Sequence, residues 1–487
     1  MRKSYIFFIV SLLLFPLLSF GQIEGVENRT DDTSVEKKSK KKKEKNPDGI
    51  KIGWTFGVLL SVAFDADLGF QFGVLGNVFY YGDGSTYPDY MHSMYVEAAY
   101  TTKRYGIFRF SYDSKYLIPK HRFSFDVTYV PDAMCDFLGY NGYQSVYNEL
   151  WRNSKLDPKP YYKTRAFYKY KRELLRIAPD ISGTIKGNWK WAAGAGLLAY
   201  YTNRVDFEMI NRNKKEEKIL PDMATLYDKY VQWNIIKENE ANGGIHPYVR
   251  AGFVFDSRNS QNNASTGMYA DAFFTYTAGF GKSSDYHNLK FNAVFQHYVP
   301  IDKKYATFAY RAGVQLLVAG NSPFYMDNYL NMLYYQRVLY EAVGGANSVR
   351  GLIRNRVLAN GFGYATAEFR IKVFKFDIAK QHFYIGFNPF CDMGILLQPK
   401  ELDKDVPLNE ENVTRKITLS DPDFNLDELT YYFDFGKNKF TPHFGAGIGM
   451  KIAMNENFIL SVDWAMPFNK QDNHSKANIY IKMGYLF

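Results

Sequence analysis

Apolar and polar residues alternate one by one along most of the chain from Lys51 onward. In 364–373, for example, every second residue from Ala365 to Val373 is apolar, and polar or charged side chains and one Tyr stand between them. Successive side chains of a β-strand point to opposite faces, so this pattern predicts a strand with one apolar face. Sixteen such segments occur, and we predict strands at 52–62, 67–80, 93–101, 105–114, 121–130, 165–178, 183–202, 245–256, 267–279, 286–299, 304–319, 361–375, 382–396, 440–453, 456–468 and 475–487.

Four connections between these strands are much longer than the others, and each follows an odd-numbered strand. All four connections therefore lie at the same end of the strands. Outer-membrane barrels have an even number of antiparallel strands, with short periplasmic turns and long external loops. We predict an all-β fold, a 16-stranded antiparallel transmembrane β-barrel over 51–487. Its long external loops are 131–164, 203–244, 320–360 and 397–439.

The composition supports a barrel over a bundle of transmembrane helices. The chain contains 40 Tyr, 40 Phe and 37 Gly. Beyond the N-terminus, no apolar run approaches the ~20 residues that a spanning helix needs. Two cysteines cannot form a disulfide framework, and none of the 8 His belongs to a cluster with zinc-like spacing.

The first residues form a predicted export signal. Arg2 and Lys3 precede an apolar stretch that ends before the small-residue site around Gly21, so we assign 1–21 as a signal peptide. Residues 22–50 are rich in Lys and poor in apolar side chains, which predicts a disordered periplasmic tail. The tail is interpreted as a solvated linker or, alternatively, as a contact for anionic lipid headgroups.

Nothing in the sequence predicts an enzyme. We find no arrangement of nucleophile, base and acid, and we expect no catalytic residue, no metal, no cofactor and no nucleic-acid partner. The acidic residues of loop 397–439 are interpreted as solvated surface charge, with calcium binding as the alternative.

The second half of the chain contains four short stretches of distinctive sequence. They are 247–267 (PYVRAGFVFDSRNSQNNASTG), 298–302 (YVPID), 344–351 (GGANSVRG) and 390–394 (FCDMG). These stretches resemble the BamA/TamA outer-membrane assembly-factor (bacterial surface antigen) superfamily, which also includes two-partner secretion translocators. Stretch 344–351 is similar to the family's Val-Arg-Gly loop, and stretch 390–394 to its Asp-x-Gly strand. The resemblance implies that the Val-Arg-Gly loop folds back into the barrel.

The physical chemistry of two acidic residues agrees with an inward loop. By alternation, Glu368 and Asp392 both face the lumen on adjacent strands, where they would repel each other unless a cation paired with them. An Arg guanidinium can bond carboxylates in a bidentate way, and the resemblance implies that Arg350 reaches them. The alternative is an external loop with an exposed Arg and two solvated acids. The other residues of this predicted barrel lock are Val349, Gly351 and Gly394.

The predicted last strand carries one more candidate. Its apolar face runs from Ala477 to Phe487, so we expect the strand to end at the carboxylate. Gly484 lies three residues before that end and would weaken pairing. If 52–62 pairs poorly with this strand, the barrel has a lateral seam that opens toward lipid. The alternative is a fully paired barrel.

The resemblance implies a cell outer membrane protein of Gram-negative type that assists the insertion, assembly or translocation of other outer-membrane or surface proteins. We expect no polypeptide-transport-associated (POTRA) domains, because only the Lys-rich tail precedes the barrel. The expected partners are outer-membrane lipids and other outer-membrane or periplasmic assembly proteins that would supply such domains in a complex. The alternative is a passive pore or structural barrel that keeps the family plug without insertase activity.

Overall fold

The protein is represented by a computed structural model that describes residues 50–487 except 157–160, 262, 328–342, 379–380, 456–457 and 475–476. The predicted signal peptide and the predicted Lys-rich tail lie outside the described residues, apart from Ile50. In the described part of the chain, no helix is both long and apolar enough to cross a membrane.

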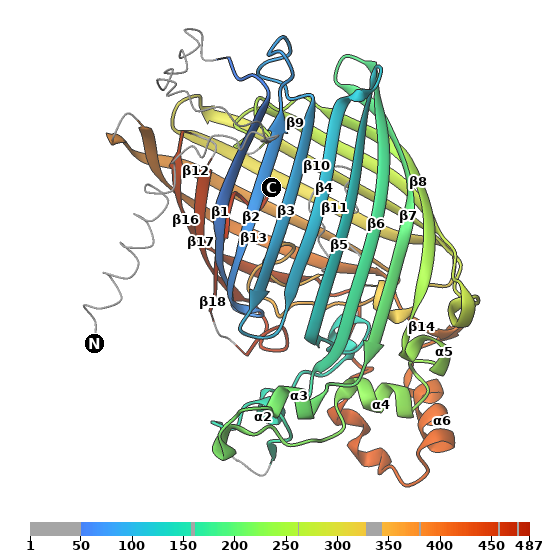
Figure 1. Cartoon of the computed structure of the whole chain (residues 1–487). Coiled ribbons are helices and arrows are strands. Elements are labelled where there is room, and N and C mark those ends of the chain that lie inside the picture. Colours follow the sequence, from blue (N-terminus) through green and yellow to red (C-terminus); the bar gives the residue numbers. More distant parts are fainter. Residues whose placement is uncertain are drawn as a thin grey trace, which may run out of the picture.

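Sixteen antiparallel strands form a closed barrel in sequence order (Figure 1), which confirms the predicted fold class. Two short strands, β14 (Glu401–Asp403) and β15 (Val406–Pro407), pair with each other outside it. The barrel strands are β1 (Trp54–Asp65), β2 (Gly69–Tyr80), β3 (His92–Thr101), β4 (Gly106–Ile118), β5 (His121–Asp136), β6 (Lys169–Lys186), β7 (Trp189–Asn203), β8 (Gly243–Asp256), β9 (Gly267–Thr277), β10 (Asn288–Asp302), β11 (Ala306–Gly320), β12 (Gly361–Ile378), β13 (Gln381–Gln398), β16 (His443–Met454), β17 (Phe458–Pro467) and β18 (Asn478–Met483).

Strand β6 has a weak alternation of hydrophobicity because charged side chains occupy its lumen-facing positions. Its buried side chains alternate regularly and include Arg172, Arg176 and Asp180. These residues face inward; Arg176 lies 2.9 Å from Asp126 of β5, and Asp180 lies 2.6 Å from Arg250 of β8. Because charged side chains occupy inward positions, alternation in burial is strict where alternation in hydrophobicity is poor.

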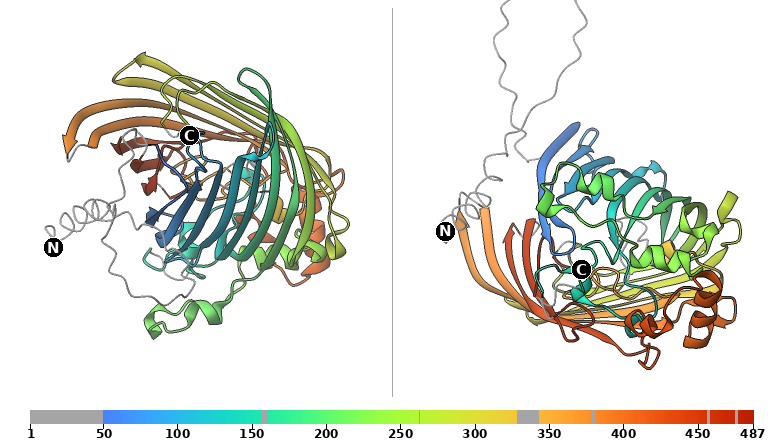
Figure 2. Two further views of the ribbon diagram at one scale, coloured as in Figure 1. Left: turned by 45° about the horizontal axis from the view of Figure 1, so that its top comes forward. Right: turned by 90° about the horizontal axis from the view of Figure 1, so that it is seen from below.

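The long connections gather at one end of the barrel, at the bottom of Figure 1, where short helices form a cap (Figures 1 and 2). By the topology of outer-membrane barrels this is the external end. Its α-helices are α2 (Glu149–Arg152), α3 (Phe207–Asn211), α4 (Leu226–Gln232), α5 (Glu238–Ala241) and α6 (Glu410–Ser420). Its 3-10 helices are η1 (Gly142–Gln144), η3 (Glu216–Lys218), η4 (Gly281–Ser283), η5 (Phe324–Met326) and η6 (Leu426–Tyr431).

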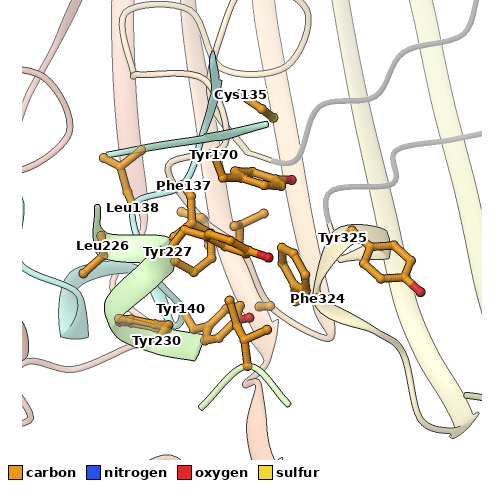
Figure 3. Close-up of a cluster of buried hydrophobic side chains, with 14 of the residues drawn as sticks. Cys135, Phe137, Leu138, Tyr140, Tyr170, Leu226, Tyr227, Tyr230, Phe324 and Tyr325 are labelled. Atoms are coloured by element: carbon orange, nitrogen blue, oxygen red, sulfur yellow. The ribbon is translucent and has the colours of Figure 1, made fainter. Parts of the chain in front are cut away.

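An aromatic cluster joins the cap loops to one another (Figure 3). Phe137, just beyond β5, makes edge-to-face contacts with Tyr230 of α4 and Phe324 of η5 at ring-centroid distances of 5.2 and 6.2 Å. Tyr230 also stacks on Phe433 at 5.6 Å. Such pairs add to the free energy of burial itself. Four connections that are distant in sequence therefore share one core.

The prediction for the last strand is wrong at its end. Strand β18 ends at Met483, and Gly484 takes a positive φ of +86° that turns the chain inward. Tyr485 and Phe487 therefore leave the apolar outer face and lie beside the guanidinium of Arg370, at 4.1 and 4.8 Å from their ring centroids. The aromatic rings that alternation assigned to the apolar face of the strand instead cover a cation in the lumen.

Candidate functional site

The described part of the connection between β11 and β12, residues 321–327 and 343–360, is called the plug loop here, and its second segment folds into the barrel. Its tip, residues 344–356, is almost completely buried. The tip turns sharply through three glycines in the left-handed region, where a side chain would be disfavoured. Their φ angles are +120° at Gly344, +93° at Gly345 and +96° at Gly351.

Arg350 lies at the centre of the tip and has no exposed side-chain surface. Its backbone N, Nε and Nη2 donate to the carboxylate of Asp392 at 2.9, 2.8 and 3.0 Å. Nη2 also lies 2.9 Å from Oε1 of Glu368. The guanidinium stacks 3.3 Å from the ring centroid of Phe390. The structure thus brings the arginine and the two acids of the predicted lock together in one buried cluster.

A third carboxylate, which the sequence reasoning missed, completes this cluster. Asp463 of β17 lies 3.2 Å from Nη1 of Arg350 and also pairs with Lys451. Glu368 has a second cation in Arg370, at 3.0 Å. Three acids therefore face three cations, which limits the cost of burying them. The same inward alternation that selected Glu368 could have selected Asp463.

Small residues on the barrel wall make room for the tip. A Cβ on Gly394 would lie 2.1 Å from Cγ1 of Val343 and 3.2 Å from Cγ2 of Val349. A Cβ on Gly445 of β16 would lie only 1.9 Å from the carbonyl oxygen of Arg350. Gly394 was predicted from the Asp-x-Gly stretch. Gly445 was not, although glycines at alternate positions of one strand are a recognisable sign of close backbone approach.

The seam between β1 and β18 is short. β1 pairs with β2 along its whole length, from Trp54 to Asp65. On its other side it pairs with β18 only through Phe64–Ile481 and Asp65–Tyr480. Both pairs lie at the external end of β1, and the chain turns inward at Gly484 soon afterwards. Among the described residues, the edge of β1 from Trp54 to Ala63 thus has no strand partner.

Comparison with known proteins places this barrel in a family. The model of the Omp85 superfamily domain matches residues 92–487, most of the chain. The chain belongs to the Omp85 superfamily. This confirms the resemblance found in the sequence, and it implies an outer-membrane location, because Omp85 barrels are outer-membrane proteins that work with partner proteins.

Two solved structures show a similarity to this chain. BamA from Haemophilus ducreyi lacking POTRA domains 1-3 aligns with a TM-score of 0.48 and 12% identity, over 88% of this chain and 70% of that chain. CdiB from Escherichia coli aligns with a TM-score of 0.47 and 12% identity, over 88% of this chain and 63% of that chain. No curated protein sequence matches the chain.

The chemistry of this Omp85 site is ionic and structural. The described residues include no group of three or more His, Cys, Asp or Glu side chains that could hold a metal ion. Arg350 and its acids fix the plug loop to one wall, formed by β12, β13 and β17. Strand β17 is the neighbour of β18, so this wall adjoins the seam between β18 and β1. The site therefore combines a fixed plug with an incompletely paired seam.

We expect Gly445→Ala to loosen the plug. The new methyl group would collide with the Arg350 carbonyl, and overpacking of this kind costs about 1–3 kcal/mol. The measurement is the temperature at which the folded barrel loses its altered mobility on a gel. Gly57→Ala in β1 is the control, because nothing lies within 4 Å of a Cβ there. Equal unfolding temperatures for the two variants would contradict the close contact.

Asp67, in the turn after β1, makes stability depend on pH. Burial, followed by repulsion from Asp65 and Asp136, raises the pKa of Asp67 from 3.8 to about 7. The folded protein therefore holds this proton more tightly than the unfolded chain, so the free energy of unfolding falls as pH rises between these values. We expect the drop in unfolding temperature from about pH 5 to about pH 8 to be smaller in Asp67→Asn than in the wild type. The same drop in both proteins would refute this.

Proposed function

We propose that this Omp85 barrel assists the insertion, assembly or translocation of other outer-membrane or surface proteins, and that it does so at the seam between β1 and β18. The proposed role is non-enzymatic: the protein offers a docking edge and a lateral exit, and no covalent bond changes. In keeping with the family, the barrel would act with partner proteins that receive or deliver client chains.

The observation that carries this proposal is the unpaired edge of β1. A row of unpaired backbone N–H and C=O groups is a template for a further strand. In the bilayer each such group is costly, so lipid-exposed open edges are avoided. The outward side chains of this edge strand, among them Trp54, Val58 and Leu60, are exposed and apolar, as expected next to lipid. A client strand that adds to this edge would satisfy these groups, which is the mode known as β-augmentation.

The plug and cap argue against an open channel, so the alternative to be tested is the passive pore or structural barrel that keeps the plug. The tip fills the lumen beside Arg350, and the aromatic core of the cap joins the loops across the external end. A structural barrel without insertase activity keeps all of these features and differs only in what the seam does. The effect of the protein on other outer-membrane proteins in cells therefore distinguishes the two roles, whereas a measurement of conductance distinguishes them poorly.

The test is depletion of the protein followed by quantification of the outer-membrane proteins. We expect the amounts of several other barrels or surface proteins to fall together before growth slows. Re-expression of the wild-type chain should restore them, whereas re-expression of an unrelated barrel of similar size should not. Unchanged outer-membrane composition after depletion would refute the proposal and leave the structural role.

A further inference from the structure

The tip of the plug loop also contacts the C-terminal edge of the seam. The N–H of Gly351 donates to the hydroxyl of Tyr480 in β18 at 3.2 Å. The carbonyl of Gly351 accepts from the side-chain amide of Asn478 at 3.3 Å. Further along β18, Nζ of Lys482 donates to the carbonyl of Ala346 at 3.1 Å. Three hydrogen bonds therefore tie the tip to the strand that forms one side of the seam.

A few residues further on, the tip contacts the N-terminal edge. The N–H of Arg354 donates to Oδ2 of Asp67, in the turn between β1 and β2, at 3.2 Å. Its guanidinium pairs with Asp132 at 2.6 Å and with Asp136 at 3.2 Å, both on the external end of β5. Asn355 adds a bond from its amide to the carbonyl of Asp136 at 3.2 Å. Arg354 thus holds the tip to the half of the barrel that begins with β1.

These two sets of contacts meet at the one end of the seam that is still paired. The pair Asp65–Tyr480 is the last of the seam, and Asp67 lies two residues beyond Asp65. An apolar contact spans the same place, since Ala346 of the tip packs in one cluster with Tyr480 and Ala66. The tip therefore lies across the inner face of the joint between the two barrel edges.

We propose that the tip is a clasp, held to the C-terminal side of the seam by Arg350 and Gly351 and to the N-terminal side by Arg354. Arg354 is the positioning residue of this clasp: it acts on the seam through the placement of the tip. Without it, the tip remains fixed to Asp392 and loses its charge-assisted hold on β5, so the external end of the seam separates more readily. The proposal rests on the proposed function only in taking this seam as the part that clients use.

The test measures the seam itself in purified full-length protein in liposomes without any client. Spin labels are placed at the paired positions through Phe64→Cys and Ile481→Cys in a Cys391→Ser background, and the distance between them is measured by pulsed electron paramagnetic resonance. Adding Arg354→Gln should increase the long-distance, separated fraction roughly tenfold, the factor expected for loss of a hydrogen bond to a charged group.

The matched control is Arg122→Gln. It breaks a bidentate pair with Asp113, at 2.6 and 2.9 Å, at the opposite end of β5, and it should leave the separated fraction unchanged. If Arg354→Gln does not insert, Arg354→Lys is used, and it should give a smaller increase, because an ammonium lacks the planar fork. An unchanged fraction in the Arg354 variant, or an equal increase in the Arg122 control, would overturn the clasp. Because the assay contains no client, unchanged outer-membrane composition after depletion would remove the proposed function and leave the clasp intact.

Discussion

Arg350→Ala should leave the barrel inserted in the membrane and lower its resistance to heat unfolding more than any other single change in the lumen. Asp392 loses both hydrogen bonds from the Arg350 guanidinium and stays buried with only the backbone N–H of residue 350 as a donor from the tip, whereas Glu368 and Asp463 keep Arg370 and Lys451. Removing one partner of a buried ion pair costs about 3–5 kcal/mol. The measurement is the unfolding temperature on a gel.

Two further variants test whether this loss is electrostatic. Arg350→Lys should recover only part of the stability, because an ammonium cannot bond several carboxylates with a planar fork. In a background that carries Asp392→Asn and Glu368→Gln, Arg350→Ala should cost much less, since fewer buried charges are left unpaired. If Arg350→Ala costs the same in both backgrounds, the three residues are not coupled, and the loop is not held by this cluster.

A disulfide across the seam should abolish the function of the protein in cells. Phe64 and Ile481 are direct partners in the antiparallel ladder, at a separation that a disulfide can span. Phe64→Cys with Ile481→Cys, in the Cys391→Ser background, should therefore cross-link under oxidising conditions and prevent the edges from parting. We expect the oxidised variant not to restore client proteins in depleted cells, and a reductant to recover its activity.

The control for this experiment is a second cysteine pair on the other side of β1. Val62 and Phe72 are partners in the fully paired β1–β2 ladder, so a disulfide between Val62→Cys and Phe72→Cys adds a cross-link without closing the seam. It should leave activity intact. Full activity of the oxidised seam variant would mean that clients do not need the seam to open.

The strands could be predicted because the bilayer enforces their pattern. A lipid-facing position must be apolar, and the next residue faces the lumen, so each strand carries the alternation in its own sequence. This is why all sixteen barrel strands were found, most of them within a few residues of their ends. The error at Phe487 has a local cause, since the positive φ of Gly484 ends the alternation.

The plug was predictable in part and its connections were not. Arg350, Glu368 and Asp392 could be grouped because a motif marked the arginine and alternation turned both acids inward. The partners of Arg354 lie on β5, more than two hundred positions away, and no local pattern relates a loop residue to a wall residue at that distance. Asp67 and Asp132 likewise acquire their roles only when the tip is folded across the seam.

The most direct test of the account places a photoreactive amino acid at Leu60, on the unpaired part of β1, in living cells. We predict covalent adducts between this position and other outer-membrane or surface proteins during their assembly. The control position is Phe253, in the fully paired strand β8, whose side chain is 57% exposed compared with 65% for Leu60. Adducts at Leu60 that are absent at Phe253 would establish the edge of β1 as the place where clients dock. The same adducts at both positions, or none at Leu60, would contradict it.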